Sequence, residues 1–318
     1  MRGGNRMWRD FDRAVEMMFQ FVNGKRVVLW GYEKSGWFIE HLFKRANKQI
    51  DYIIDNSPVI SPKLKIYRSF IIKEMDKDTH IILLTFADDG KARKFLEELG
   101  FIEGKNFIFV RNIFYTNEMH RKLSYHDWLE YQYNVDIIRI KGLYDDIQKP
   151  RIDCLYYSAG IDYALMDALD KFIFNSEQDA VFDFGCGKRG ALLLFQKSGI
   201  IRLGGVEYDA DVFETLCNNF KKVGFDTKGL LNNDAILIKK ELDEYNYFFM
   251  YNPFQGETFD NVIRNIQESY DRRPRKITFI YSGTYCHNSV LLNSTFKLSK
   301  EIYTDYSVRY INVYTMND

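Results

Sequence analysis

The clearest pattern of apolar and polar positions lies in the second half of the chain, where an apolar segment runs into a glycine-rich turn. Residues 181–184 place apolar side chains around Asp183, glycines follow at Gly185 and Gly187, and residues 191–195 are apolar again. This pattern predicts a strand, a tight turn and a helix. Ligands bind at the carboxyl ends of parallel strands, where glycines let the backbone approach them, so we expect this loop to hold a ligand.

The remainder of this half predicts more strands of the same sheet and a final hairpin. The apolar stretches that predict strands lie at residues 201–206, 247–251, 276–281, 295–304 and 308–315. A short turn separates the last two stretches, so they must pair in antiparallel fashion. A purely parallel dehydrogenase sheet has no need of such a hairpin.

Strands and helices also alternate in the first half, after a short amphipathic helix at residues 11–22. The predicted strands lie at residues 25–30, 50–54, 80–86 and 106–110. The predicted helices between them lie at residues 37–46 and 90–99. Such alternation is typical of a doubly wound parallel sheet.

The fold class is therefore α/β, with two doubly wound Rossmann-like sheets. We expect an N-terminal Rossmann-like domain at residues 1–115 and a second domain at residues 151–318. Residues 116–150 are helical in pattern and rich in aromatic and charged side chains, which predicts a helical connector whose aromatic rings pack in a core or between domains.

Length and charge limit the partners. A chain of 318 residues suggests about two domains, and a hydrophobic fraction of 46% is ample for their cores. Lys plus Arg and Asp plus Glu number 44 each, so no net field attracts nucleic acid. The basic run at residues 272–276 is interpreted as a helix end and turn rather than as a nucleic-acid patch.

Cysteine spacing and hydropathy predict the location. The four cysteines stand at positions 154, 186, 217 and 286, without the close pairs of a zinc site or a disulfide framework. We therefore expect no metal and a reducing compartment. No apolar run reaches the length of a membrane span, and charges interrupt the first 22 residues, which excludes a signal peptide there. The sequence predicts a soluble, cytoplasmic protein.

Two acidic residues indicate what the loop binds. Glu207 ends the strand at residues 201–206, about twenty residues after the first acid, where such folds hold a ribose. Asp183 would repel a pyrophosphate and attract an ammonium or sulfonium group. A dinucleotide site and a purely structural turn remain alternatives, since the glycine spacing alone is weak evidence.

These residues resemble the class I, seven-strand S-adenosylmethionine-dependent methyltransferases. Asp183, Gly185 and Gly187 match the first motif of that family, Asp/Glu-x-Gly-x-Gly. The resemblance implies a sheet with a reversed last strand, Glu207 as the ribose-binding acid and Asp234 as the adenine-contacting acid. The chain departs from the motif where the family often has a third glycine, because Arg189 stands there and Gly190 follows. The course of the loop is therefore open.

The same resemblance places the methyl-transfer end of the site. Asn252-Pro253-Phe254 is similar to the Asn/Asp-Pro-Pro-Phe/Tyr motif of enzymes that methylate amines, but the second proline is missing. It places Asn252 and Tyr251 at the reacting end without fixing the acceptor atom. Tyr157 precedes the first motif, in a segment that folds over the cofactor in that family. His287 is interpreted as a surface residue of a loop. A role as a general base is the alternative.

The predicted function is methyl transfer from S-adenosylmethionine to a small-molecule or glycan-type acceptor. One alternative is a degenerate methyltransferase fold that serves as a scaffold. Another is an enzyme that binds NAD or a nucleotide-sugar in the first domain, where Asp55 falls at the ribose position but Glu33 takes the place of the second glycine. The identity of the acceptor and the oligomeric state are left open.

Overall fold

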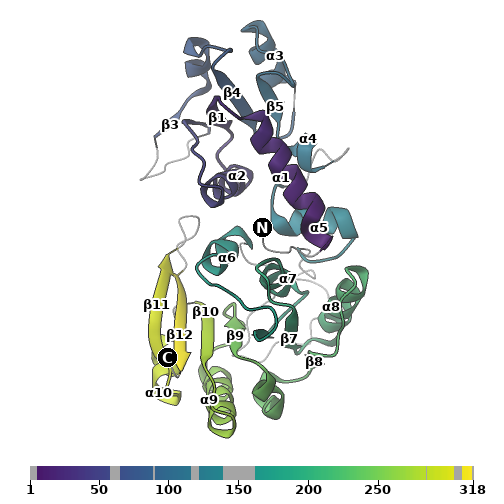
Figure 1. The fold of residues 1–318 in the computed structure, drawn as a ribbon, viewed down its shortest axis with the longest axis vertical. Coiled ribbons are helices and arrows are strands. Elements are labelled where there is room, and N and C mark those ends of the chain that lie inside the picture. Colours follow the sequence, from purple (N-terminus) through teal and green to yellow (C-terminus); the bar gives the residue numbers. More distant parts are fainter. Residues whose placement is uncertain are drawn as a thin grey trace. The chain divides into compact units, whose positions relative to one another are not determined.

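The computed structural model describes residues 6–57, 65–88, 90–115, 122–138, 162–283, 285–303 and 310–316 (Figure 1). The chain divides into two compact units, and the division falls between Gln132 and Tyr133. The domain limits predicted near residues 115 and 150 stay predictions.

The first unit is built on a parallel sheet of five strands in the order β3-β2-β1-β4-β5. The strands are β1 (Arg26–Trp30), β2 (Tyr52–Ile54), β3 (Ile66–Tyr67), β4 (His80–Leu84) and β5 (Phe107–Phe109). The helices are α1 (Arg9–Phe21), α2 (Lys34–Arg45), α3 (Lys91–Glu98), α4 (Arg111–Phe114) and α5 (Tyr125–Tyr133), with 3-10 turns at Arg6–Trp8 and Ser69–Glu74. The alternation of strands and helices that the sequence predicts is confirmed.

Aromatic side chains hold α5 against the first unit. Trp128 stacks on Trp8 with ring centroids 5.7 Å apart. Tyr125 contacts Phe11 at 5.0 Å and Phe38 at 5.1 Å. Aromatic pairs at these distances add to the stabilisation that burial itself supplies. These aromatic side chains of the predicted connector therefore pack in a core.

The second unit contains a sheet of seven strands in the order β11-β12-β10-β9-β6-β7-β8. The strands are β6 (Ala180–Phe184), β7 (Arg202–Glu207), β8 (Leu230–Asn232), β9 (Tyr247–Met250), β10 (Ile277–Ser282), β11 (Lys297–Tyr303) and β12 (Tyr310–Met316). Strand β12 runs antiparallel to both β10 and β11, while β6 to β10 pair in parallel. The predicted fold class, with a reversed last strand, is confirmed.

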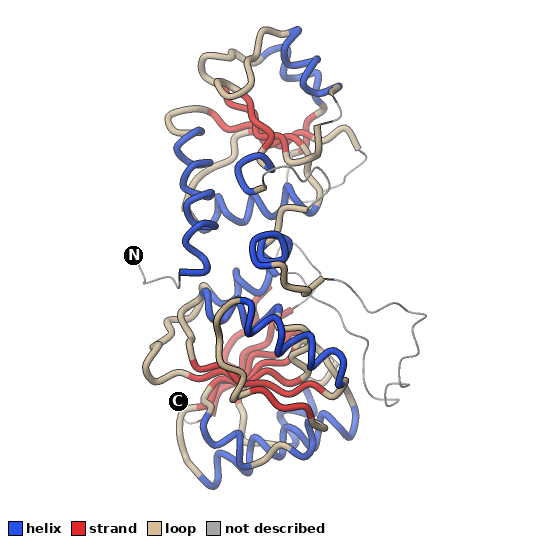
Figure 2. The backbone as a smooth tube through the Cα atoms, turned by 90° about the vertical axis from the view of Figure 1, so that its right-hand side faces the viewer, coloured by secondary structure: helices blue, strands red, loops and turns tan. Residues whose placement is uncertain are grey.

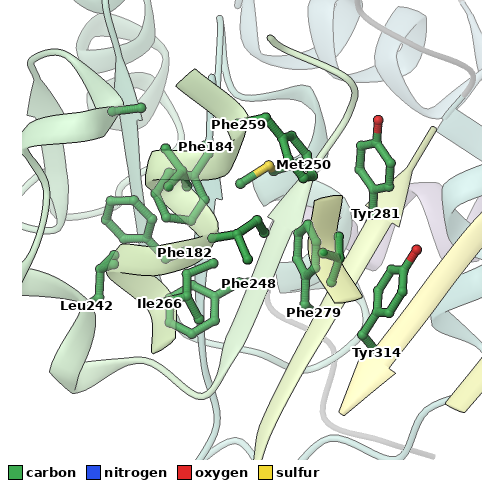
Figure 3. Packing of buried hydrophobic residues seen from close by; sticks show 14 of the residues in the cluster. Phe182, Phe184, Leu242, Phe248, Met250, Phe259, Ile266, Phe279, Tyr281 and Tyr314 are labelled. Atoms are coloured by element: carbon green, nitrogen blue, oxygen red, sulfur yellow. The ribbon is translucent and has the colours of Figure 1, made fainter. Parts of the chain in front are cut away.

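Helices lie on both faces of this sheet, as the tube in Figure 2 shows. They are α6 (Asp162–Leu169), α7 (Gly190–Lys197), α8 (Ala210–Lys222), α9 (Gly256–Arg272) and α10 (His287–Asn293), with 3-10 turns at Ala235–Leu237 and Lys240–Glu244. Aromatic and aliphatic side chains from β6, β9, β10 and β12 pack against α9 in one buried cluster (Figure 3). Phe182, Phe248, Phe279 and Ile266 are fully buried there. This core fixes the carboxyl ends of the strands.

The basic run at residues 272–276 is the end of α9 and the turn after it, as predicted. Arg272 bonds Asp243 at 2.8 Å, and Arg273 bonds Glu244 at 2.8 Å. Arg275 donates to backbone carbonyl oxygens, including those of Tyr245 and Leu242. Arg272, Arg273 and Arg275 therefore make hydrogen bonds within the second unit.

Among the helices of the described ranges, none combines the length and the apolar character that crossing a bilayer requires. The cytoplasmic location stays a prediction.

Candidate functional site

The second sheet has its topological switch point between β6 and β9. From β6 the chain moves outward to β7 and β8, and it then returns to the opposite side of β6 as β9. In open α/β sheets the ligand binds outside the carboxyl ends of the strands at such a point. Asp183 lies at the end of β6, Glu207 at the end of β7, and Asn252 two residues after β9. The topology therefore gathers three predicted site residues at one edge.

The loop after β6 is held in a left-handed course by the end of β7. The backbone N–H groups of Gly185 and Cys186 donate to the same carbonyl oxygen, that of Val206, at 2.9 and 3.0 Å. Gly185 and Gly187 have φ of +70° and +53°. Only glycine adopts such angles without a steric penalty, which is why the loop needs glycine at both positions.

Arg189 stands at the position where the third glycine is missing, and its conformation shows how the loop passes this point. Its φ is +95°, so the backbone makes the left-handed turn that a glycine would make there. The side chain is fully buried and lies over Phe220, with 3.2 Å from its guanidinium carbon to the ring centroid, and 4.6 Å from Phe225. Burial lowers the pKa of this guanidinium well below its usual value. Within the described residues none of its nitrogen atoms has a hydrogen-bond partner, so the two rings are the contacts that anchor it.

Glu207 ties the loop to the end of β7 through both carboxylate oxygens. Oε2 accepts a hydrogen bond from the N–H of Gly187 and Oε1 accepts one from the N–H of Asp209, both at 3.0 Å. Burial raises the pKa of Glu207, and these two hydrogen bonds oppose that effect. A carboxylate oxygen has more than one acceptor site, so Glu207 keeps acceptor capacity for a ligand.

Asp183 is more deeply placed than the sequence suggests. Its side chain is 3% exposed, whereas the sequence predicts a charged group at the mouth of the turn. Burial raises the pKa of Asp183 well above its usual range, and the neighbouring charge of Glu207 raises it further. No hydrogen bond from the described residues reaches its carboxyl group. A cation bound beside Asp183 would lower this pKa and favour the carboxylate form.

The loop after β9 lies directly against the loop after β6. A Cβ atom placed on Gly185 would lie 2.5 Å from the Cβ of Pro253. Asn252, the preceding residue, has φ of +45°, an uncommon angle outside glycine that clusters at functional sites. Its Oδ1 accepts a hydrogen bond from the hydroxyl group of Tyr281 at 3.1 Å. The predicted cofactor loop and the predicted reacting end are thus in contact.

Tyr281 and Cys286 support Asn252 from the neighbouring strand β10 and the turn after it. Burial raises the pKa of both groups. Sequence reasoning did not single out Tyr281. The available signal was its position at the end of a predicted strand, beside the strand that ends in Asn252-Pro253.

His287 is not the loop residue that the sequence predicts. It is the first residue of α10, and its Nδ1 lies 2.8 Å from the hydroxyl oxygen of Tyr314 on β12. That hydrogen bond explains the histidine as part of the packing between α10 and β12. The loop prediction failed because α10 has only seven residues, which leave little periodicity to detect.

The remaining predicted residues are distributed along the same edge. Asp234 is half-buried after β8, where its Oδ1 accepts from the N–H of Ile236 at 3.1 Å and caps a 3-10 turn. Tyr251 is half-buried and directly follows β9. Tyr157 lies outside the described residues. Within the described ranges, no three His, Cys, Asp or Glu side chains are grouped as a metal site would require.

No family model matches the chain, and no curated protein matches it. Solved structures match about half of it. A ribosomal protein L11 methylase from Lactobacillus delbrueckii subsp. bulgaricus is 12% identical with a TM-score of 0.38, and the match covers 48% of this chain and 76% of that chain. The magnesium protoporphyrin IX methyltransferase of Synechocystis PCC 6803, solved with bound S-adenosylmethionine, is 10% identical with a TM-score of 0.37, covering 48% and 78%.

An RNA methyltransferase from Salinibacter ruber, solved with S-adenosyl-L-homocysteine, is 14% identical with a TM-score of 0.36, covering 48% of this chain and 89% of that chain. These structural neighbours are methyltransferases. Their identities and scores assign neither an activity nor an acceptor to this chain, so the proposal that follows rests on the site itself.

Proposed function

We propose that the second unit binds S-adenosylmethionine and that the protein transfers its methyl group to a small-molecule or glycan-type acceptor. The observation that carries this proposal is the pair of acids, Asp183 and Glu207, beside the left-handed glycine loop at the switch point. Asp183 disfavours the phosphates of a dinucleotide and suits a ligand that carries a sulfonium and an ammonium group. Glu207 suits the ribose of such a ligand.

Each residue has a definite task in this proposal. Gly185 and Gly187 let the backbone approach the amino-acid part of the cofactor, whose ammonium group Asp183 attracts. Glu207 accepts hydrogen bonds from the ribose hydroxyl groups. Its hydrogen bonds from two backbone N–H groups leave acceptor sites for them. Asp234 lies one strand further along the edge, at the position proposed for the adenine. Tyr157 is proposed to cover the cofactor.

The reacting end requires positioning more than acid or base catalysis. The cofactor, when bound, supplies an electrophilic methyl group. Asn252 and Tyr251 follow β9, where they would orient the acceptor for in-line attack. The contact between Pro253 and Gly185 fixes the loop that carries them to the cofactor loop. Correct alignment alone lowers a barrier by as much as about 7 to 11 kcal/mol, so a site without a catalytic triad is sufficient.

The first unit gives little support to the alternative that it binds NAD. Gly31 follows β1, where a dinucleotide fold has its first glycine, which makes the tight turn. Here a Cβ on Gly31 would lie 2.5 Å from Oγ1 of Thr85 and 2.7 Å from the ring of Phe86. The hydroxyl group of Thr85 also donates to the carbonyl oxygen of Gly31 at 2.6 Å. Packing against the two residues that follow β4 therefore accounts for this glycine without a ligand.

Transfer of a labelled methyl group tests the proposal. We expect the full chain to move tritium from labelled S-adenosylmethionine to a component of the small-molecule or glycan fraction of a cell extract. Binding without transfer to any fraction would favour the scaffold alternative. Absence of binding would contradict the proposal.

A further inference from the structure

The hydrogen bond between Tyr281 and Asn252 determines which end of the Asn252 amide is available. Tyr281 donates its hydroxyl proton to Oδ1 of Asn252 at 3.1 Å. Among the described residues, this is the only hydrogen bond of the Asn252 side chain. Its Nδ2 is not among the fully buried polar atoms that lack a partner, so it is open to solvent or to a ligand. The group that Asn252 offers is therefore a donor, N–H₂.

Tyr281 keeps the proton that this hydrogen bond uses. Burial raises the pKa of Tyr281 and that of Cys286, so both groups keep their protons at neutral pH. The single hydroxyl proton of Tyr281 is donated to Oδ1 of Asn252.

An exposed donor discriminates between acceptor atoms. An amine that attacks a methyl group must keep its lone pair free and point its own N–H groups at acceptors. The N–H₂ of Asn252 would face those N–H groups, donor against donor. A hydroxyl or carboxylate oxygen has a second lone pair, which can accept from Nδ2 while the first attacks.

We propose that the acceptor of this protein presents an oxygen atom, as a hydroxyl or carboxylate group, and that Asn252 Nδ2 holds that oxygen while Tyr281 positions the amide. This inference rests on the proposed methyltransferase function. In the step, an oxygen lone pair forms the new O–CH₃ bond and the S–CH₃ bond breaks. The bonding pair returns to sulfur as a neutral thioether. A hydroxyl acceptor releases its proton to water, and a carboxylate acceptor has none to release.

The orientation of the amide can be measured without any substrate. Protein labelled with nitrogen-15 at asparagine would be studied by water-exchange NMR, and Asn252→Asp would assign the Asn252 signals by their loss. We expect both Nδ2 protons to exchange with water in the wild type and to keep their exchange rates in Tyr281→Phe. If one proton is protected in the wild type and becomes fast in Tyr281→Phe, Nδ2 donates to Tyr281 and the inference is wrong.

The product decides the acceptor atom. Tritium transferred to an extract component should be released as methyl iodide by hydriodic acid, and alkali should release it as methanol only if the product is an ester. Label that resists both treatments and binds to a cation exchanger would show an amine acceptor and overturn the inference.

Asn252→Asp gives a matched test, because aspartate also tolerates the left-handed backbone. It replaces the donor by a carboxylate, so we expect transfer to fall by a factor on the order of 10² to 10³, the usual effect of losing one such donor. If the acceptor is an amine, the transfer rate of Asn252→Asp should instead stay within about tenfold of the wild-type rate. Calorimetry with S-adenosylmethionine runs alongside. Lost cofactor binding in the wild type would reject the proposed function, whereas intact binding with an N-methylated product would reject this inference alone.

Discussion

Asp183 is a buried acid whose environment opposes its ionisation, through burial and through the charge of Glu207. The folded state therefore binds the Asp183 proton more tightly than the unfolded chain does. A carboxyl group with a raised folded pKa stabilises the fold below its unfolded pKa, about 3.9, and this contribution is lost as the pH rises towards the folded pKa.

Asp183→Asn should therefore be more stable than the wild type at neutral pH. The difference in the free energy of unfolding should vanish near pH 4 and grow as the pH increases. Urea denaturation of both proteins across that range measures it. A constant difference at all pH values would mean that Asp183 ionises normally in the fold.

Glu207 is the residue on which the ribose part of the proposal depends. Glu207→Ala removes the carboxylate proposed to accept from the two ribose hydroxyl groups, together with its bonds from the N–H groups of Gly187 and Asp209. Hydrogen bonds to charged groups contribute about 1.5 to 3 kcal/mol each, so S-adenosylmethionine affinity should fall at least about tenfold, the factor that 1.4 kcal/mol represents.

The first unit offers a matched control for that variant. Asp55 accepts from the N–H of Tyr32 at 2.6 Å and from the N–H of Ser57 at 2.7 Å, in the same arrangement after its own second strand. Asp55→Ala removes equivalent bonds and should leave S-adenosylmethionine affinity unchanged. Equal affinity in wild type, Glu207→Ala and Asp55→Ala would remove Glu207 from the site.

At the scale of elements, the contact between the loops after β6 and β9 gives a sharp prediction. Gly185→Ala places a Cβ atom 2.5 Å from Pro253 in a left-handed residue, which forces the two loops apart. Gly224→Ala is the control, because Gly224 has φ of +76° with nothing within 4 Å of the added atom.

The control should cost about 1 to 2 kcal/mol of stability, the usual penalty of the left-handed region. Gly185→Ala should cost more than the control and should also weaken cofactor binding. Denaturation and calorimetry of the two variants measure both effects. Similar losses in the two proteins would show that the loop contact is not needed.

Long apolar stretches and glycine turns made most elements predictable. The strand, turn and helix around Gly185 and the hairpin of β11 and β12 follow from periodicity and from the length of the connection. Strand β3 has only two residues, and β8 has three, the last of which is Asn232, so neither shows an apolar stretch as long as those of the predicted strands.

The environment of the site residues could be predicted less well from the sequence. The burial of Asp183 depends on the strands β7 and β9 that flank β6. The support of Asn252 by Tyr281 joins residues 29 positions apart. The sequence predicts which residues end the strands, whereas three-dimensional packing sets their ionisation and hydrogen bonds.

At the scale of the whole molecule, the proposed cofactor site lies entirely in the second unit. A fragment that begins at Tyr133 contains every strand of the seven-stranded sheet. If circular dichroism shows the fragment to be folded, we expect it to bind S-adenosylmethionine with the affinity of the full chain. A folded fragment that fails to bind would mean that the first unit contributes to the pocket.

The central claim is that the acidic switch point selects a cationic cofactor over a dinucleotide, and parallel calorimetric titrations with S-adenosylmethionine and NAD test it most directly. We predict that the full chain binds S-adenosylmethionine and not NAD. Asp183→Asn, nearly isosteric and uncharged, should weaken S-adenosylmethionine and, if it changes NAD at all, relieve repulsion. Binding of NAD by the wild type, lost in Asp183→Asn while S-adenosylmethionine binds neither protein, would contradict the account.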